Sequence, residues 1–143
     1  MTYIDTSSFI KLLLVEPESE EIEKVIRILD VVVVTSLTRL EARVQARGFV
    51  AGGRLDSRAG NRFEIDMKEL LNEAPFQTFK LEGSIFETAI RQQETSIVHC
   101  RSLDRLHLAA MEELGVRRLM THDGRQAEAA RELGYEVVMP GVD

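Results

Sequence analysis

Four acidic side chains in this sequence are spaced so that they could build one catalytic or metal-binding site: Asp5, Glu41, Asp104 and Asp123. Asp5 and Asp123 follow apolar segments that are typical of strands, whereas Glu41 and Asp104 lie in segments with helical spacing. Carboxylates that converge repel one another unless a cation lies between them. Because oxygen ligands of this kind suit a hard divalent ion such as Mg²⁺, the sequence predicts a divalent-metal site.

Each of these acids also has an ordinary explanation when it is considered alone. Asp5 stands where a helix N-cap is expected, and Asp104 stands where the helix dipole favours an acid. Asp123 belongs to Thr121-His122-Asp123-Gly124, which is typical of a turn, and Glu41 fits a solvent-exposed helical position. The metal site is therefore a prediction about the four acids together, and it depends on the elements that carry them.

Hydroxyl and imidazole groups lie close to the acids in the sequence. The hydroxyl residues are Thr6, Ser7, Ser8 and Thr121, which could orient a carboxylate or hold a metal-bound water, but which also cap helices routinely. His107 lies one turn after Asp104, where it could contact a phosphate or transfer a proton; a packed histidine is the alternative. The chain has no His-x-x-x-His pair, so a zinc hydrolase of that kind is not indicated.

The elements that must position these residues alternate along the chain. Strands are predicted at 2–5, 31–35, 76–81, 117–121 and 136–139, with helices between them. The run from Val31 to Val34 is too apolar to have one face in water, and such strands belong to parallel sheets covered on both faces. We therefore expect an α/β fold in one domain, residues 1–143, with a mostly parallel central sheet flanked by helices on both faces. The carboxyl ends of parallel strands converge on the edge where ligands bind, which would bring the four acids together.

Capping residues indicate where several helices begin and end. Ser36 or Thr38 is expected to cap the helix that carries Glu41. A longer helical stretch is expected from about residue 55 to 72, and Gly115 is expected to end the helix that Asp104 begins.

The composition limits the classes of protein to consider. Hydrophobic residues make up 44% of the chain, enough for a core, and no apolar run approaches the roughly 20 residues that span a bilayer. No signal peptide is indicated, so we expect a cytoplasmic protein without a membrane partner. The single cysteine, Cys100, excludes an internal disulfide and a Cys-rich zinc site. The net charge of −6 argues against generic binding to nucleic acid, yet a metal-dependent nuclease is compatible with it because bound cations cancel the charge of the site.

At these residues the chain resembles the PIN-domain family, and within it the VapC-type toxins of toxin–antitoxin pairs. Four segments carry the resemblance: Tyr3-Ile4-Asp5-Thr6-Ser7-Ser8, Ser36-Leu37-Thr38-Arg39-Leu40-Glu41, Arg101-Ser102-Leu103-Asp104-Arg105-Leu106-His107, and Thr121-His122-Asp123-Gly124-Arg125. The resemblance implies an endoribonuclease, a hydrolase of RNA phosphodiester bonds that depends on Mg²⁺ or Mn²⁺. It also implies a homodimer and a cognate antitoxin that blocks the acidic pocket.

The resemblance also assigns roles to the acids. Asp5 and Asp104 would be the main metal ligands, Asp123 a further ligand, and Glu41 would complete the catalytic set directly or through water. Basic residues near the acids are candidates for phosphate contacts or ordinary surface cations: Lys11, Arg101, Arg105 and Arg125. Arg105 stands where a small residue is common in the family.

Two other functions stay open at this point. A phosphatase of the haloacid-dehalogenase type also begins with an Asp after a strand, but it needs a second Asp two residues later, where this chain has Ser7. A PIN-like module that binds RNA or protein without cutting it is the non-enzymatic alternative, and the presence of all four acids disfavours it.

Overall fold

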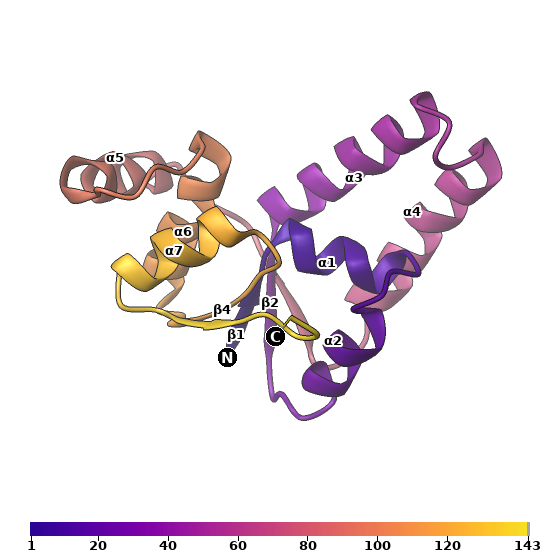
Figure 1. Ribbon diagram of the computed structural model, residues 1–143, viewed down its shortest axis with the longest axis horizontal. Helices are drawn as coiled ribbons and strands as arrows, with labels where there is room; N and C mark the ends of the chain where they lie inside the picture. The colour runs from indigo at the N-terminus through magenta and orange to yellow at the C-terminus, as the bar shows by residue number, and fades with distance from the viewer. Residues whose placement is uncertain (143) are drawn as a thin grey trace.

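Five short strands form one sheet in the order β3-β2-β1-β4-β5, and every neighbouring pair is parallel. The computed structural model describes residues 1–142 (Figure 1). The strands are β1 (Thr2–Ile4), β2 (Val32–Thr35), β3 (Phe76–Phe79), β4 (Arg118–Met120) and β5 (Glu136–Val138). The predicted α/β fold is confirmed, and each strand lies within two residues of its predicted bounds.

Seven helices in the described residues surround the sheet: α1 (Thr6–Leu13), α2 (Ser19–Ile26), α3 (Ser36–Ala51), α4 (Ser57–Leu71), α5 (Ile85–Thr95), α6 (Ser102–Leu114) and α7 (Gly124–Glu132). Figure 1 shows α6 and α7 on one side of the sheet and α1 and α2 on the other. The far ends of α3 and α4 extend beyond the sheet as a pair. Within residues 1–142, each helix is too short or too polar to cross a bilayer.

Alternation along the strands divides the core between the two faces. Tyr3 and Val33 pack with residues of α5, α6 and α7 on one face. Their chain neighbours Ile4, Val32 and Val34 pack with residues of α1, α2, α3 and α4 on the other. Successive strand side chains point to opposite faces, so a strand covered on both faces must be apolar at every position. Val32, Val33 and Val34 are buried for this reason, and Val31, just before the strand, is partly buried.

The helix boundaries differ from the predictions in one informative way. Thr35, rather than Ser36 or Thr38, is the N-cap of α3, and its hydroxyl oxygen accepts a hydrogen bond from the Thr38 N–H over 3.5 Å. β2 passes into α3 without a loop, so the last strand residue must itself cap the helix. Gly115 ends α6 with a φ of 69°, as predicted, because this left-handed conformation suits glycine.

The strand order places three strand ends side by side at the carboxyl edge of the sheet. β1 lies between β2 and β4, and the chain leaves β1 directly through Asp5. Glu41 lies in the second turn of the helix that follows β2, and Asp123 lies three residues beyond the end of β4. The helices that connect β1 to β2 and those that lead into β4 pack on opposite faces of the sheet, which makes this edge the usual place for a ligand site in an open α/β sheet.

Candidate functional site

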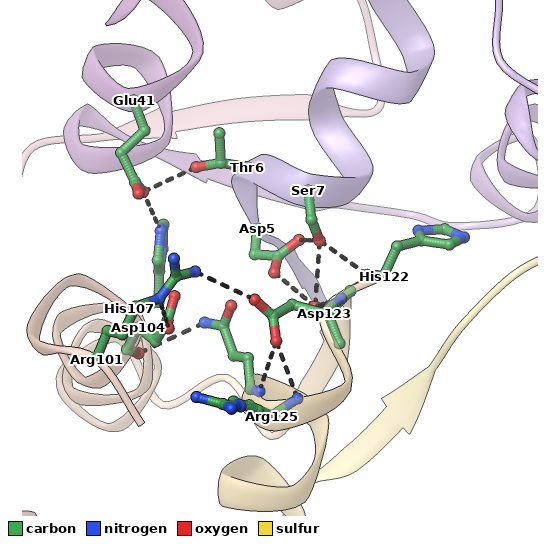
Figure 2. Close-up of polar contacts among 12 residues, drawn as sticks. Asp5, Thr6, Ser7, Glu41, Arg101, Asp104, His107, His122, Asp123 and Arg125 are labelled. Carbon is green, nitrogen blue, oxygen red and sulfur yellow. Dashed lines mark hydrogen bonds and ion pairs between the residues drawn. The ribbon is translucent and has the colours of Figure 1, made fainter. Parts of the chain in front are cut away.

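All four acids line one small cavity, of about 50 Å³, at the carboxyl edge of the sheet (Figure 2). Its wall is formed by Asp5, Thr6, Ser7, Glu41, Gln45, Arg101, Asp104, His107, Asp123 and Gln126. These residues come from α1, α3, α6, α7 and the segments that precede them. The structure therefore brings together all four acids that the sequence predicts as site residues.

Asp5 is the most enclosed of the four acids, and three donors hold its carboxylate. Its Oδ1 accepts hydrogen bonds from the Ser7 hydroxyl (2.7 Å) and the Ser8 N–H (3.1 Å), while its Oδ2 accepts one from the Thr121 hydroxyl (2.5 Å). Burial raises the pKa of Asp5 above its usual range, and the hydrogen bond from Thr121 opposes that shift. Asp5 is thus both the N-cap of α1 and a wall of the cavity, so its two interpretations are compatible.

A single guanidinium group joins Asp104 to Asp123. Arg101 Nε donates to Asp104 Oδ2 over 3.1 Å, and Arg101 Nη2 donates to Asp123 Oδ2 over 3.4 Å. The other oxygen of Asp123 accepts from the backbone N–H groups of Arg125 and Gln126 as the N-cap of α7. The cavity therefore contains a positive group between two carboxylates from different elements.

Glu41 is held in place from two sides. Its Oε1 accepts a hydrogen bond from the Thr6 hydroxyl (2.8 Å) and lies 2.5 Å from His107 Nε2. Burial alone would raise the pKa of Glu41, but the hydrogen bonds from His107 and Thr6 hold that pKa below its usual value. These partners therefore favour the ionised form of Glu41.

A buried chain of hydrogen bonds lies behind Glu41. His107, whose side chain is 1% exposed, has its Nδ1 2.7 Å from the Tyr3 hydroxyl, which in turn lies 3.0 Å from the Thr35 hydroxyl. An ionised carboxylate only accepts, so His107 Nε2 carries the hydrogen toward Glu41 and Nδ1 accepts from Tyr3. Burial raises the pKa of Tyr3, which keeps its hydroxyl protonated as the donor.

These hydrogen bonds show whether His107 is a packed core residue or part of the candidate site. The residue is packed, as the ordinary explanation requires, and it also touches a candidate catalytic acid. Tyr3 was not foreseen as part of the site. Its partner His107 is 104 positions away, and nothing in the local sequence distinguishes Tyr3 from any other core tyrosine.

The donor set fits a divalent ion such as Mg²⁺. The acids present oxygen ligands from separate elements, and Asp5 is a buried carboxylate whose ionised form needs positive charge nearby. The Arg101 guanidinium already acts as a cation between two of the acids. No three His, Cys, Asp or Glu side chains among residues 1–142 are arranged to hold one ion as they stand. Mg²⁺ keeps several of its waters, so ligation by fewer carboxylates with bridging water suits this geometry.

The structure separates the basic residues that were candidates for phosphate contacts. Arg105 is 4% exposed and donates to the Ser96 hydroxyl over 2.9 Å, so it is not an ordinary surface cation and is poorly placed for a phosphate contact. Lys11 forms an ion pair with Glu18 over 2.9 Å. Arg101 and Arg125 together line an open hollow beside the acidic cavity, where a phosphate could approach both.

Comparison with known proteins agrees with the fold. The family model of the PIN domain matches residues 2–132. The chain belongs to the PIN-domain family. It is 30% identical over 140 residues to ribonuclease VapC46 of Mycobacterium tuberculosis, and the match covers 96% of each chain. This PIN domain therefore stands with the VapC-type members of the family.

Two solved structures share the fold at low sequence identity. One is Mycobacterium tuberculosis VapC20, described as a Sarcin-Ricin loop cleaving toxin, with a TM-score of 0.73, 16% identity and coverage of 98% of this chain and 100% of that one. The other is FitAcB of Neisseria gonorrhoeae, with a TM-score of 0.71, 17% identity and 98% coverage of both chains. These neighbours confirm the arrangement of the sheet and helices in this PIN domain.

Replacing Asp5 by Asn is expected to stabilise the metal-free protein near neutral pH. Because the folded-state pKa of Asp5 is raised, its contribution to stability is full at low pH and is lost as the pH rises through that pKa. Asn keeps an N-cap acceptor without the charge. Thermal melts in EDTA should show a Tm difference between Asp5→Asn and the wild type that is small near pH 4 and grows toward pH 7. The exposed Asp30→Asn variant is the control, and a difference independent of pH would contradict the prediction.

Removing the Tyr3 hydroxyl is expected to destabilise the fold. Tyr3→Phe leaves the buried His107 Nδ1 and the Thr35 hydroxyl without their partner, which costs about 1–3 kcal/mol for an unsatisfied buried group. Urea denaturation measures the change in the free energy of unfolding. Tyr135→Phe is the matched control. Tyr135 is the other tyrosine of the protein, and it lies beneath Arg117, outside the hydrogen bonds that join Tyr3, His107 and Thr35. Equal effects of the two substitutions would show that the hydrogen-bond chain contributes nothing specific.

Proposed function

We propose that this PIN domain is a divalent-metal-dependent endoribonuclease and the toxin of a toxin–antitoxin pair. The observation that carries the proposal is the convergence of Asp5, Glu41, Asp104 and Asp123 on one small cavity at the carboxyl edge of the sheet. Membership of the family supports it, and so does the likeness to a relative named as a ribonuclease.

The acids divide into ligands and a proton acceptor. Asp5, Asp104 and Asp123 would hold Mg²⁺ or Mn²⁺, which when bound supplies a Lewis acid for the phosphodiester and lowers the pKa of a water. Glu41 is suited to take the proton of the attacking water, since Thr6 and His107 both bond to its Oε1 and leave its Oε2 for that proton. Arg101 and Arg125 are placed beside the cavity to contact the RNA backbone.

Partners follow from the same proposal. The substrate is RNA, and an antitoxin protein would block the acidic cavity. One further structural neighbour is VapBC2 of Rickettsia felis bound to a DNA fragment from its promoter, with 9% identity, a TM-score of 0.71 and coverage of 96% of this chain and 98% of that one. We propose a homodimer as well, because large apolar side chains on the long helices α3 and α4 are exposed, including Leu40 (60%), Val44 (61%) and Ile65 (47%).

Cleavage of a structured RNA should require a divalent ion and two of the acids. Asp5→Asn and Asp104→Asn are expected to lower the cleavage rate by at least about 100-fold, since even outer partners of metal ligands contribute about 10–100-fold. Activity should disappear in EDTA and return with Mg²⁺ or Mn²⁺. Gel analysis of a labelled RNA measures the rate, and the exposed Asp30→Asn variant is the charge-matched control.

Two outcomes would count against this function. Cleavage that survives EDTA, or survives both substitutions, would exclude a metal-dependent nuclease. Binding of Mg²⁺ without any cleavage would favour a silent PIN-like module instead.

Light scattering after gel filtration tests the homodimer. A mass of twice the 16.2 kDa chain is expected, and Val44→Glu should reduce it to that of one chain if the exposed face of α3 belongs to the contact. Arg27→Glu, on the exposed end of α2, is the control for a charge placed elsewhere. A single-chain mass at every concentration would exclude the homodimer.

A further inference from the structure

Arg101 occupies an unusual position for an exposed side chain. It is the N-cap residue of α6, yet its side chain makes no capping hydrogen bond. The side chain is 71% exposed, whereas those of its partners Asp104 and Asp123 are 9% and 26% exposed. Figure 2 shows the guanidinium extending from α6 across to Asp123. A mostly solvated cation thus reaches into a site made of more enclosed acids.

The oxygens that Arg101 holds are the ones a metal ion would need. Asp123 Oδ1 is committed to the backbone N–H groups of Arg125 and Gln126, so its Oδ2 is the atom left for a cation, and Arg101 Nη2 contacts that atom. Arg101 Nε contacts Asp104 Oδ2 in the same way. Both contacts come from one side chain, so a single movement releases both oxygens.

A guanidinium and a divalent ion compete for these oxygens. Mg²⁺ binds carboxylate oxygen at about 2.1 Å and demands near-octahedral geometry, which restricts the donors that can approach the same oxygen. The two cations also repel each other at such short separation. Ion binding therefore favours withdrawal of the Arg101 side chain.

A hollow beside the cavity can accommodate the Arg101 side chain after it leaves the acids. Arg101 lines the open hollow next to the cavity together with Asp123, Gly124, Arg125 and Glu128. In this hollow two guanidinium groups can contact the same anion, and Arg pairs suit phosphate because each presents a planar set of donors. This position lies beside the acids, where a phosphate of bound RNA would lie.

We propose that Arg101 is an internal counter-ion, which neutralises Asp104 and Asp123 before a divalent ion binds and then moves to a phosphate of the substrate. The inference rests on the proposed metal-dependent nuclease function. It assigns Arg101 two successive partners: the carboxylates in the metal-free protein, and the RNA backbone in the loaded one.

Because Arg101 would contact first the acids and then the RNA, its replacement should change the affinity for the ion and the affinity for RNA in opposite directions. Arg101→Gln removes a competitor for the acids, so affinity for the ion should rise; an exposed ion pair corresponds to about a two- to five-fold change in an equilibrium constant. The same substitution removes a phosphate contact, so the KM for RNA at saturating Mg²⁺ should rise. A residue with only a structural role would not shift the two affinities in opposite directions.

The experiment combines calorimetry with kinetics on the full chain. Mn²⁺ alone is titrated into the wild type, Arg101→Gln and Arg125→Gln, without RNA. Tighter Mn²⁺ binding is expected only for Arg101→Gln, because the Arg125 side chain contacts neither acid while its hollow-lining position is matched. Cleavage kinetics should then give a higher KM for both variants. Arg101→Lys, which keeps the charge but cannot span both acids, is expected to bind Mn²⁺ with intermediate affinity.

Different failures have different meanings. Unchanged or weaker Mn²⁺ binding by Arg101→Gln, or an unchanged KM, would overturn the counter-ion proposal while leaving the nuclease intact. A wild type that neither binds Mn²⁺ nor cleaves RNA would overturn the proposed function and the counter-ion with it.

Discussion

The mutual repulsion of carboxylates in a confined space is the constraint on which this structure depends. Four acids around a cavity of about 50 Å³ cannot all be ionised without compensation. The protein compensates each one differently. Hydroxyl and backbone donors surround Asp5, His107 and Thr6 hold Glu41, and Arg101 lies between Asp104 and Asp123. These partners offset the charge of the acids only in part, so the site remains negative and suits the divalent ion that we propose.

The fold, and the acids that make up the site, could be predicted from patterns that are local in sequence. The apolar run at Val31 to Val34 requires cover on both faces, and that requirement selects a parallel α/β sheet. Parallel strands then bring their carboxyl ends to one edge, so Asp5 and Asp123 meet although 118 positions separate them in the numbering (123 − 5). Sheet topology, rather than any long-range signal, made these acids predictable.

Features that depend on side-chain packing were not predictable in the same way. Arg105 reads as a surface cation because arginine side chains are seldom fully buried, but α6 turns it inward to Ser96. The role of Tyr3 depends on the spatial neighbours His107 and Thr35. Thr35 itself became a cap because the strand and the helix meet without a loop. In each case tertiary contact overrides what the local residues favour, and a single sequence contains no record of that contact.

The loop-free junctions at the carboxyl edge also determine where this chain can change in length. Ile4 ends β1 and Thr6 begins α1, so Asp5 is the entire connection, and β2 passes directly into α3. An inserted residue at either junction would rotate the following helix by about 100° and displace the acid that it positions. The opposite edge has ordinary loops, such as 27–31 and 72–75, where added residues leave helix faces in place. Insertions and deletions among descendants of this sequence should therefore collect at the amino edge of the sheet, away from the acids.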